Sequence, residues 1–378
     1  MKKVLSIIAA LLAAATLFAQ DNAKKEIKAY SGETTVTLQG SYTPSFAVDG
    51  IDKKVNNVIL LIGDGMGLGA VNAAMYANGG ELTMTNLRHF GFVRTQSANK
   101  FTTDSAASGS AYATGVKTNN GFLGMDPDKK AVANIPEKVA DAGIACGVVS
   151  TDNMSGATPA AFFAHQDSRS KSEAIWADLA SSKLCFASAG SMPVFEGIRK
   201  ETQKAIKENY KVVGSLKDFS SADEKVVYLP QSVQYAERGD YLPVTTEAAI
   251  EFLAAKKGKG FFLMVEGARI DKESHSNNCE GTVRETLDFD KAIEAAIRFA
   301  EKDGHTLVII SADHETGAVA MRDAKPAEGF VEVSYSTGSH SPIAVPLFAF
   351  GPHSADFCCY QENSDVSNKI VSLLLSRK

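Results

Sequence analysis

Five apolar runs recur along the chain, and each ends in a polar or glycine-rich turn. Continuous runs of β-branched and aromatic residues of this length are typical of strands buried on both faces, as in a parallel sheet. Segments with helical spacing alternate with them, and this alternation predicts an α/β layered fold. We therefore expect a three-layer sandwich with a central, mostly parallel sheet flanked by helices. The predicted strands are 57–62, 146–149, 261–265, 306–310 and 345–350.

The clearest predicted helices lie between and after these runs. Pro136 stands at a helix start, and Gly143 marks the end of that helix. Residues 286–300 carry apolar side chains near helical spacing, and residues 365–376 do so at the end of the chain.

Two stretches depart from this pattern. Residues 21–54 contain one predicted strand, at 34–38, which we expect to form an arm or an edge strand. Residues 183–246 carry a Lys- and Glu-rich helix near 201–209 and are otherwise irregular, so we interpret them as an insertion beside the sheet.

The first twenty residues have a different character. Two lysines precede an apolar run over 4–18, and a polar stretch begins after Ala19. This order of a positively charged segment, an apolar segment and a small residue at the cleavage site predicts a secretory signal peptide. An uncleaved N-terminal anchor is the alternative. We divide the chain into a signal peptide, 1–20, and one domain, 21–378. The mature protein is then expected to be periplasmic or secreted, without membrane attachment.

Composition narrows the class of protein. The 378 residues are 44% hydrophobic with a formal net charge of −5, which excludes a disordered chain and argues against a general binder of nucleic acid or anionic membranes. The five cysteines are an odd number, so at least one stays unpaired or pairs with another chain. They show no zinc-finger spacing, so any metal must be sought among Asp, Glu and His side chains.

Polar side chains stand at or near the ends of four predicted strands. In open α/β sheets ligands bind beyond the carboxyl ends of the strands, so these residues should meet at one edge. Taken singly, each is more often a cap or turn residue, but acids and histidines from four strands together favour a functional site. They are Asp64, Glu266, Asp271, His275, Asp313, His314 and His340.

This set of side chains suits bound metal ions. Zn²⁺ takes histidine nitrogen and carboxylate oxygen and keeps a position open for substrate, and there are enough ligands here for two such sites. Glu266 is not needed for either zinc site, and together with a hydroxyl group and water molecules it would suit Mg²⁺. Asp271 and His275, four residues apart, would align on one helical turn.

A nucleophile and an anion clamp come from other segments. Ser105 stands at the start of a small-residue stretch able to form a tightly packed helix, where free N–H groups and the helix dipole favour an anion. An ordinary helix cap is the alternative for a lone serine. Metal coordination would make the Ser105 hydroxyl a usable nucleophile. Arg169 could hold two phosphate oxygens through its fork, although a lone arginine is more often a solvated surface residue.

Six separated motifs resemble the alkaline phosphatase family, in the family's order. They are GDGMG at 63–67, TTDSAASGSAYATGVKTNNG at 102–121, ATPAAFFAH at 157–165, VEGARIDKESH at 265–275, ADHETG at 312–317 and GSH…AFGP at 338–352. The resemblance covers nearly the whole chain from about residue 57. It implies hydrolysis of small phosphate monoesters through a covalent phosphoserine, with two Zn²⁺ and one Mg²⁺ per chain, and it suggests a homodimer.

The resemblance also implies a role for individual residues. Ser105 matches the phosphorylated serine and Arg169 the phosphate-binding arginine, and Lys272 is a further expected substrate-binding residue. The implied metal ligands are Asp271, His275 and His340 for one zinc, Asp64, Asp313 and His314 for the other, and Thr158 and Glu266, with Asp64 shared, for magnesium.

One position departs from the family pattern. Gly156, two residues before Thr158, stands where many bacterial members carry an acid that touches the magnesium water shell, and Lys272, the partner of that acid, is present without it. We therefore expect a weaker magnesium site, or one that tolerates zinc. The remaining histidines, which we expect to be structural, are His89, His165, His305 and His353.

Rival functions stay open from the sequence. A sulfatase or phosphodiesterase would share the architecture, but no CxPSR-type sulfatase motif occurs, and a diester has less use for the arginine and a third metal. A noncatalytic exported protein that binds phosphate or zinc is the other alternative, although Ser105 and all the expected ligands are intact.

Overall fold

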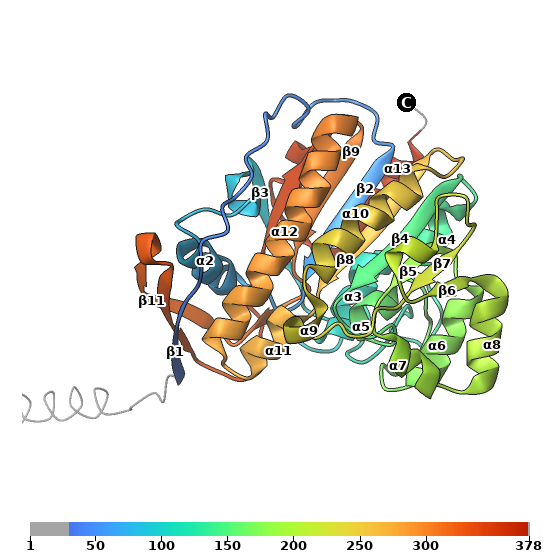
Figure 1. The fold of residues 1–378 in the computed structure, drawn as a ribbon, viewed down its shortest axis with the longest axis horizontal. Coiled ribbons are helices and arrows are strands. Elements are labelled where there is room, and N and C mark those ends of the chain that lie inside the picture. Colours follow the sequence, from blue (N-terminus) through green and yellow to red (C-terminus); the bar gives the residue numbers. More distant parts are fainter. Residues whose placement is uncertain (1–29, 377–378) are drawn as a thin grey trace, which may run out of the picture.

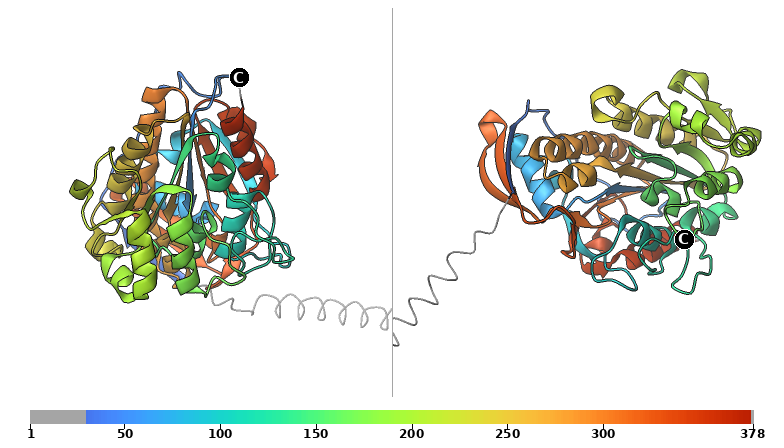
Figure 2. Two further views of the ribbon diagram at one scale, coloured as in Figure 1. Left: turned by 90° about the vertical axis from the view of Figure 1, so that its right-hand side faces the viewer. Right: turned by 90° about the horizontal axis from the view of Figure 1, so that it is seen from below.

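A ten-stranded sheet forms the centre of the structure, a computed structural model that describes residues 30–376 (Figure 1). All five predicted apolar runs form strands of this sheet. Helices cover both of its faces, so the predicted three-layer α/β sandwich is confirmed (Figure 2). The five strands are β2 (Asn57–Gly63), β4 (Ile144–Ser150), β8 (Gly260–Gly267), β9 (Thr306–Ser311) and β14 (Val345–Phe350).

The sheet is parallel with one exception. The strand order is β15-β3-β14-β9-β2-β8-β4-β5-β7-β6, and β14 runs antiparallel to both of its neighbours. Because β14 is reversed, its amino end lies at the edge where β2, β8 and β9 have their carboxyl ends. The other members are β3 (His89–Arg94), β5 (Leu184–Ser188), β6 (Lys211–Val213), β7 (Val226–Tyr228) and β15 (Tyr360–Glu362).

Residues 183–246 differ from the prediction of an irregular insertion beside the sheet. They contain β5, β7 and β6, which extend the central sheet beyond β4. The sequence hides β6 and β7 because each has three residues, too few to show a period. The Lys- and Glu-rich helix is present, as α8 (Lys200–Asn209). The same region holds α7 (Met192–Gly197) and α9 (Tyr235–Arg238) and follows α6 (Ser172–Ser181).

Two helical layers enclose the sheet. One contains α10 (Tyr241–Ala254) and the long α12 (Cys279–Asp303), which pack on β4, β8 and β9, with α2 (Leu68–Ala77) beside α12 (Figure 1). The other contains α3 (Ser105–Thr114), α4 (Ile135–Ala140), α5 (Ala157–Ala161) and α13 (Asn363–Leu375). Helix α4 begins where predicted, because Asn134 and Glu137 form a reciprocal capping box and Pro136 fits the first turn.

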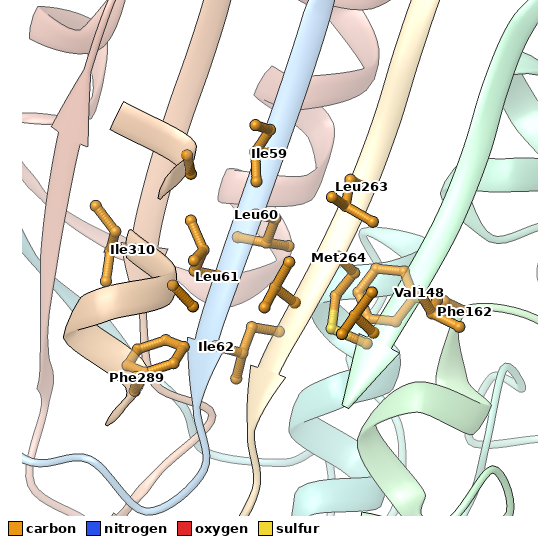
Figure 3. Close-up of a cluster of buried hydrophobic side chains, with 14 of the residues drawn as sticks. Ile59, Leu60, Leu61, Ile62, Val148, Phe162, Leu263, Met264, Phe289 and Ile310 are labelled. Carbon is orange, nitrogen blue, oxygen red and sulfur yellow. The ribbon is translucent and has the colours of Figure 1, made fainter. Parts of the chain in front are cut away.

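The apolar core lies where β2, β8 and β9 pass between these layers (Figure 3). Successive β2 side chains point to opposite faces, and all seven residues are buried because both faces are covered. Phe289 reaches the sheet from α12, while Phe162 stacks on Phe262 of β8 with ring centroids 5.8 Å apart. Full burial of each such side chain contributes roughly 1.5–3 kcal/mol. The strand ends that carry polar residues are therefore continuous with the buried core of the molecule.

A second, three-stranded sheet lies apart from the central one. Strand β1 (Tyr30–Thr35) pairs with β12 (Phe330–Tyr335), which pairs with β11 (Val319–Lys325). The strand predicted at 34–38 is thus an edge strand, and it begins four residues earlier than expected. The predicted signal peptide lies outside the described residues. Within 30–376, no helix has both the length and the apolar character needed to cross a membrane.

The short elements complete the topology. Helix α11 (Arg269–His275) follows β8 directly, and the two-residue strands β10 (Glu315–Thr316) and β13 (His340–Ser341) pair with each other. Four 3-10 helices are Met84–Asn86, Leu216–Asp218, Pro326–Glu328 and Ser354–Phe357.

Candidate active site

The carboxyl edge of the central sheet gathers the predicted polar residues. Asp64 follows β2, Glu266 lies near the end of β8, and Asp313 and His314 follow β9. Because Ile62 of β2 is level with both Glu266 and Ser311, the three strands end side by side. Gly65 then turns the chain with a φ of 73°, and a Cβ there would lie 2.8 Å from the Asp271 backbone. Glycine is therefore required for the close approach of the β2 turn to α11.

One group of possible metal ligands consists of Asp64, Asp313 and His314. His314 Nε2 lies 3.4 Å from Asp64 Oδ1 and 3.4 Å from Asp313 Oδ2. All three side chains are buried, and the ligand atoms lie within 4.8 Å of one another. Asp313 Oδ1 accepts hydrogen bonds from the N–H groups of Gly65 and His314, which leaves Oδ2 directed at the group.

A second group consists of Asp271 and His275 on α11 and His340 on β13. Asp271 Oδ1 lies 3.3 Å from His275 Nε2 and 3.5 Å from His340 Nε2, and the two imidazole nitrogens are 3.1 Å apart. The i, i+4 spacing of Asp271 and His275 places both on one face of α11, as predicted. The reversed direction of β14 brings His340, which precedes it, to this edge.

The two groups are immediate neighbours. The rings of His314 and His340 are stacked, with centroids 3.5 Å apart. Each histidine uses its other nitrogen for orientation: His275 Nδ1 contacts Gly338 O, His340 Nδ1 contacts Thr103 O, and His314 Nδ1 contacts Thr316 Oγ1. Such contacts fix the rings so that all three Nε2 atoms face the ligand groups.

Burial shifts the ionisation of these ligands. It raises the pKa of Asp313 to about 7 and that of Asp64 well above the usual range, in both cases reinforced by neighbouring carboxylates. Burial also holds the pKa of His314 well below its usual range, so the imidazole is neutral and free to coordinate. A cluster of buried acids is unfavourable on its own, and a bound cation would relieve it.

The chemistry of the donor atoms fits metal ions. Asp64 Oδ1, Asp313 Oδ2 and Thr158 Oγ1 are buried and make no hydrogen bond. Buried polar atoms without partners are uncommon in proteins and need an explanation, and cations bound at neighbouring positions would supply one for all three. Mixed carboxylate and imidazole donors suit Zn²⁺.

Glu266 and Thr158 form a third, oxygen-only set beside the first group. Both are buried, Glu266 at the end of β8 and Thr158 in α5. Burial and the nearby charge of Asp152 raise the pKa of Glu266 to about 8. Oxygen donors of this kind suit Mg²⁺ better than zinc.

Ser105 lies at the first position of α3, facing the first metal group. Its hydroxyl is 3.2 Å from His314 Nε2. The helix cap is Asp104, whose side chain accepts from the N–H of Ala107, so the capping alternative for Ser105 is wrong. With the cap supplied by its neighbour, the Ser105 hydroxyl is not needed to cap the helix and lies at its positive end.

Arg169 is held at the rim by the same Asp104. Its Nη1 lies 3.3 Å from Asp104 Oδ2, and its side chain is 41% exposed, so one edge of the guanidinium remains available to an anion. The positive charge of Arg169 lies close enough to Asp64 to lower the pKa of that carboxyl in part. Arg169 therefore belongs to this site rather than to the general surface.

Lys272 has an acidic partner, contrary to the expectation from Gly156. Lys272 Nζ lies 2.6 Å from Asp152 Oδ1. Sequence reasoning missed Asp152, although it follows β4 just as Asp64 follows β2, and the same strand-end signal could have found it. It also missed Asp104 and Thr316, whose contacts depend on the folded loops.

The remaining histidines lie away from the two ligand groups. His165 contacts Gly124 O through Nδ1 and Glu137 through Nε2, and Glu137 belongs to the α4 capping box. His89 contacts Asp49 and Ser354 through Nδ1. These contacts are consistent with the structural role expected from the sequence.

A parallel α/β sheet with carboxylates and imidazoles grouped at its carboxyl edge, beside a serine and an arginine, defines a metal-binding phosphoesterase. The comparisons with known proteins give the family. The family model described as "Alkaline phosphatase" matches residues 55–188 and 237–328. The chain belongs to the alkaline phosphatase family, and it is an enzyme of that class that hydrolyses phosphoesters.

Individual relatives agree with this assignment. The alkaline phosphatase of Escherichia coli K12 is 30% identical over 89% of this chain and 88% of its own. Alkaline phosphatase 4 of Bacillus subtilis is 34% identical over 71% of this chain and 63% of its own. The solved alkaline phosphatase of the Antarctic bacterium TAB5 is 33% identical, with a TM-score of 0.80 over 86% of this chain and 99% of its own. A variant of the TAB5 enzyme was solved with Mg bound in its M3 site.

Proposed function

We propose that the protein hydrolyses small phosphate monoesters through a covalent phosphoserine at Ser105. The observation that carries this proposal is the position of the Ser105 hydroxyl, 3.2 Å from His314 Nε2 and at the start of α3. Free N–H groups and the helix dipole at that point favour a negatively charged group on the serine oxygen.

Three cations would complete the site. Asp64, Asp313 and His314 would hold one Zn²⁺, and Asp271, His275 and His340 the other. Thr158 and Glu266, with Asp64 shared, would hold Mg²⁺. When bound, the cations supply positive charge that lowers the pKa of the serine hydroxyl and neutralises the oxygens on which charge develops.

The side chains of this protein bring about two successive displacements at phosphorus. The Ser105 hydroxyl releases its proton to solvent and its Oγ attacks the phosphorus, the phosphorus–ester oxygen bond breaks, and the alcohol leaves with a proton from solvent. Water then attacks the same phosphorus, the bond to Ser105 Oγ breaks, and inorganic phosphate leaves. Arg169, oriented by Asp104, binds two nonbridging oxygens in both steps. Positioning and charge carry most of the rate in phosphoryl transfer.

The experiment is a metal-dependence assay with an aryl phosphate on the wild type and Ser105→Ala. We expect wild-type activity to be lost to a chelator and restored by zinc, while the variant stays inactive. Zinc-replete wild type that turns over no monoester at alkaline pH would instead support a noncatalytic binding protein. An aryl phosphate and its methyl diester, compared by kcat/KM, separate a monoesterase from a diesterase.

Export belongs to the same proposal. The predicted leader, 1–20, would direct the chain to a periplasm or the medium, where the substrate would be met outside the cytoplasm. N-terminal sequencing of the exported protein tests this, and a mature chain that begins at Met1 would contradict it.

A further inference from the structure

The loop that follows β4 carries an acid next to the third, oxygen-only set of donors. Asp152 lies two residues beyond the end of β4, and its N–H donates to Ser150 Oγ at 2.8 Å. The Ser150 hydroxyl in turn donates to Glu266 Oε2. The Ser150 hydroxyl thus connects the backbone of Asp152 to the side chain of Glu266 by two hydrogen bonds.

Asp152 also occupies the space beside Gly156. A Cβ placed on Gly156 would lie 2.5 Å from Asp152 Oδ2 and 2.8 Å from Asp152 Cγ. The φ of Gly156 is −61°, which any residue adopts, so the backbone conformation does not require glycine here. Two neighbours fill the space instead: the Asp152 carboxyl group and the Asn153 carbonyl oxygen, which would lie 2.8 Å from such a Cβ.

Lys272 holds this carboxyl group in position. Lys272 is in α11, between the ligand candidates Asp271 and His275, and its Nζ lies 2.6 Å from Asp152 Oδ1. The lysine contacts one oxygen, and the other, Oδ2, is the one that faces Gly156, which caps α5. Thr158, in the first turn of α5, has a buried hydroxyl that makes no hydrogen bond.

We propose that Asp152 supplies to the third cation site the carboxylate that Gly156 cannot supply, with Lys272 fixing its orientation. This inference rests on the proposed function, because it concerns the third cation of that site. Asp152 acts as a positioning residue, through the cation and its water shell rather than on the substrate. Gly156 alone predicts a weak magnesium site. With Asp152 beside it, the site keeps a carboxylate, and the magnesium affinity is not reduced for lack of one.

The test measures Mg²⁺ binding to the zinc-loaded protein by calorimetry, with the magnesium-induced rise in melting temperature as a second readout. Asp152→Asn keeps the shape of the side chain and removes its charge, and we expect Mg²⁺ affinity to fall roughly tenfold to a hundredfold. Asp152→Glu keeps the charge and should lose less Mg²⁺ affinity than Asp152→Asn, staying within about threefold of wild type. Asp223→Asn is the matched control, because Asp223 pairs with Lys211 at 3.1 Å elsewhere on the surface and lies in none of the cation sets.

A loss of the same size in both Asp152 variants, or in neither, overturns the proposal. In Gly156→Ala the added methyl group crowds both the Asp152 carboxyl group and the Asn153 carbonyl oxygen, so it should weaken Mg²⁺ binding without removing any charge. Unchanged affinity in Gly156→Ala counts against the proposal too. Zinc-loaded wild type that hydrolyses no aryl phosphate would refute the proposed function, whereas normal hydrolysis with unchanged Mg²⁺ binding in Asp152→Asn refutes this inference alone.

Discussion

The Ser105 hydroxyl lies 3.2 Å from His314 Nε2, the ring nitrogen that also faces Asp64 and Asp313. The serine therefore lies beside the first group of possible metal ligands, Asp64, Asp313 and His314. Replacement of Ser105 by Ala should therefore lower kcat by at least roughly a thousandfold. Zinc content should stay the same, because the three ligands remain. Ser170→Ala, an exposed serine beside Arg169, is the control and should retain activity.

The phosphoserine itself is also testable. At mildly acidic pH the second displacement should slow, because water is less readily deprotonated, and the phosphorylated enzyme should accumulate with inorganic phosphate present. Intact-mass measurement should then show one added phosphoryl group on wild type and none on Ser105→Ala. Labelling of the Ala variant would place the nucleophile elsewhere.

Arg169 should govern affinity for phosphate. Its guanidinium can bind two phosphate oxygens while Asp104 holds the opposite edge. A lysine ammonium group cannot form this bidentate contact. Arg169→Lys should raise the inhibition constant of inorganic phosphate roughly tenfold, because the substitution removes about one charge-assisted hydrogen bond to the phosphate. The comparison is Lys171→Arg, an exposed neighbour paired with Asp167, for which the constant should not change.

The metal-free protein should lose stability as the pH rises. Burial raises the pKa of Asp313 to about 7 and that of Glu266 to about 8, so both stay protonated in the folded chain after the unfolded chain has released those protons. The folded state then binds more protons than the unfolded state, and the free energy of unfolding falls until the pH passes the folded pKa values. Calorimetric melting temperatures of the apo protein should be lower at about pH 8.5 than at about pH 6.5.

Added zinc and magnesium should remove most of that difference, because the bound cations favour the ionised carboxylates. Apo protein that melts at the same temperature at both pH values would show that these acids are not forced to stay protonated.

A buried ion cluster outside the ligand groups should affect the free energy of unfolding and not the activity. Arg238 is fully buried and lies 2.6 Å from Glu285 and 2.7 Å from Asp288. Arg238→Met leaves Asp288 without this partner and Glu285 with only the more distant Arg269, 3.6 Å away, and should cost about 3–5 kcal/mol of unfolding free energy. Arg322→Met, which breaks an exposed pair with Glu332, should cost less than about 1 kcal/mol, as denaturant titration of both variants will show.

The sequence predicts the central fold well, because long buried strands have an unmistakable apolar signal. It does not give the direction of β14, since a buried strand carries the same pattern whether it is parallel or antiparallel. It also misses β3, which is only partly buried, and β6 and β7, which are too short. These strands are defined by their partners in the sheet rather than by their own residues.

For the site, the residues at strand ends could be named in advance because topology brings such ends together. The contacts that support these residues could not be predicted from the sequence. Thr316 lies between His314 and Asp271, and Asp104 between Ala107 and Arg169, only once the loops have folded. The Asp152–Lys272 pair likewise depends on how the 151–156 loop turns, which the spacing of residues in the sequence does not reveal.

The two ligand groups join segments that are far apart in the chain. His275 and His340 are 65 residues apart, and Asp64 and Asp313 lie at the ends of different strands. A cation held by such groups acts as a reversible cross-link, which restricts the unfolded chain much as a disulfide does. All five cysteines, which fall within the described residues, are unpaired. If the proposed zinc ions are bound, they would provide the cross-links that disulfides do not provide among these residues, and loss of zinc would shorten the lifetime of the fold as well as stop catalysis.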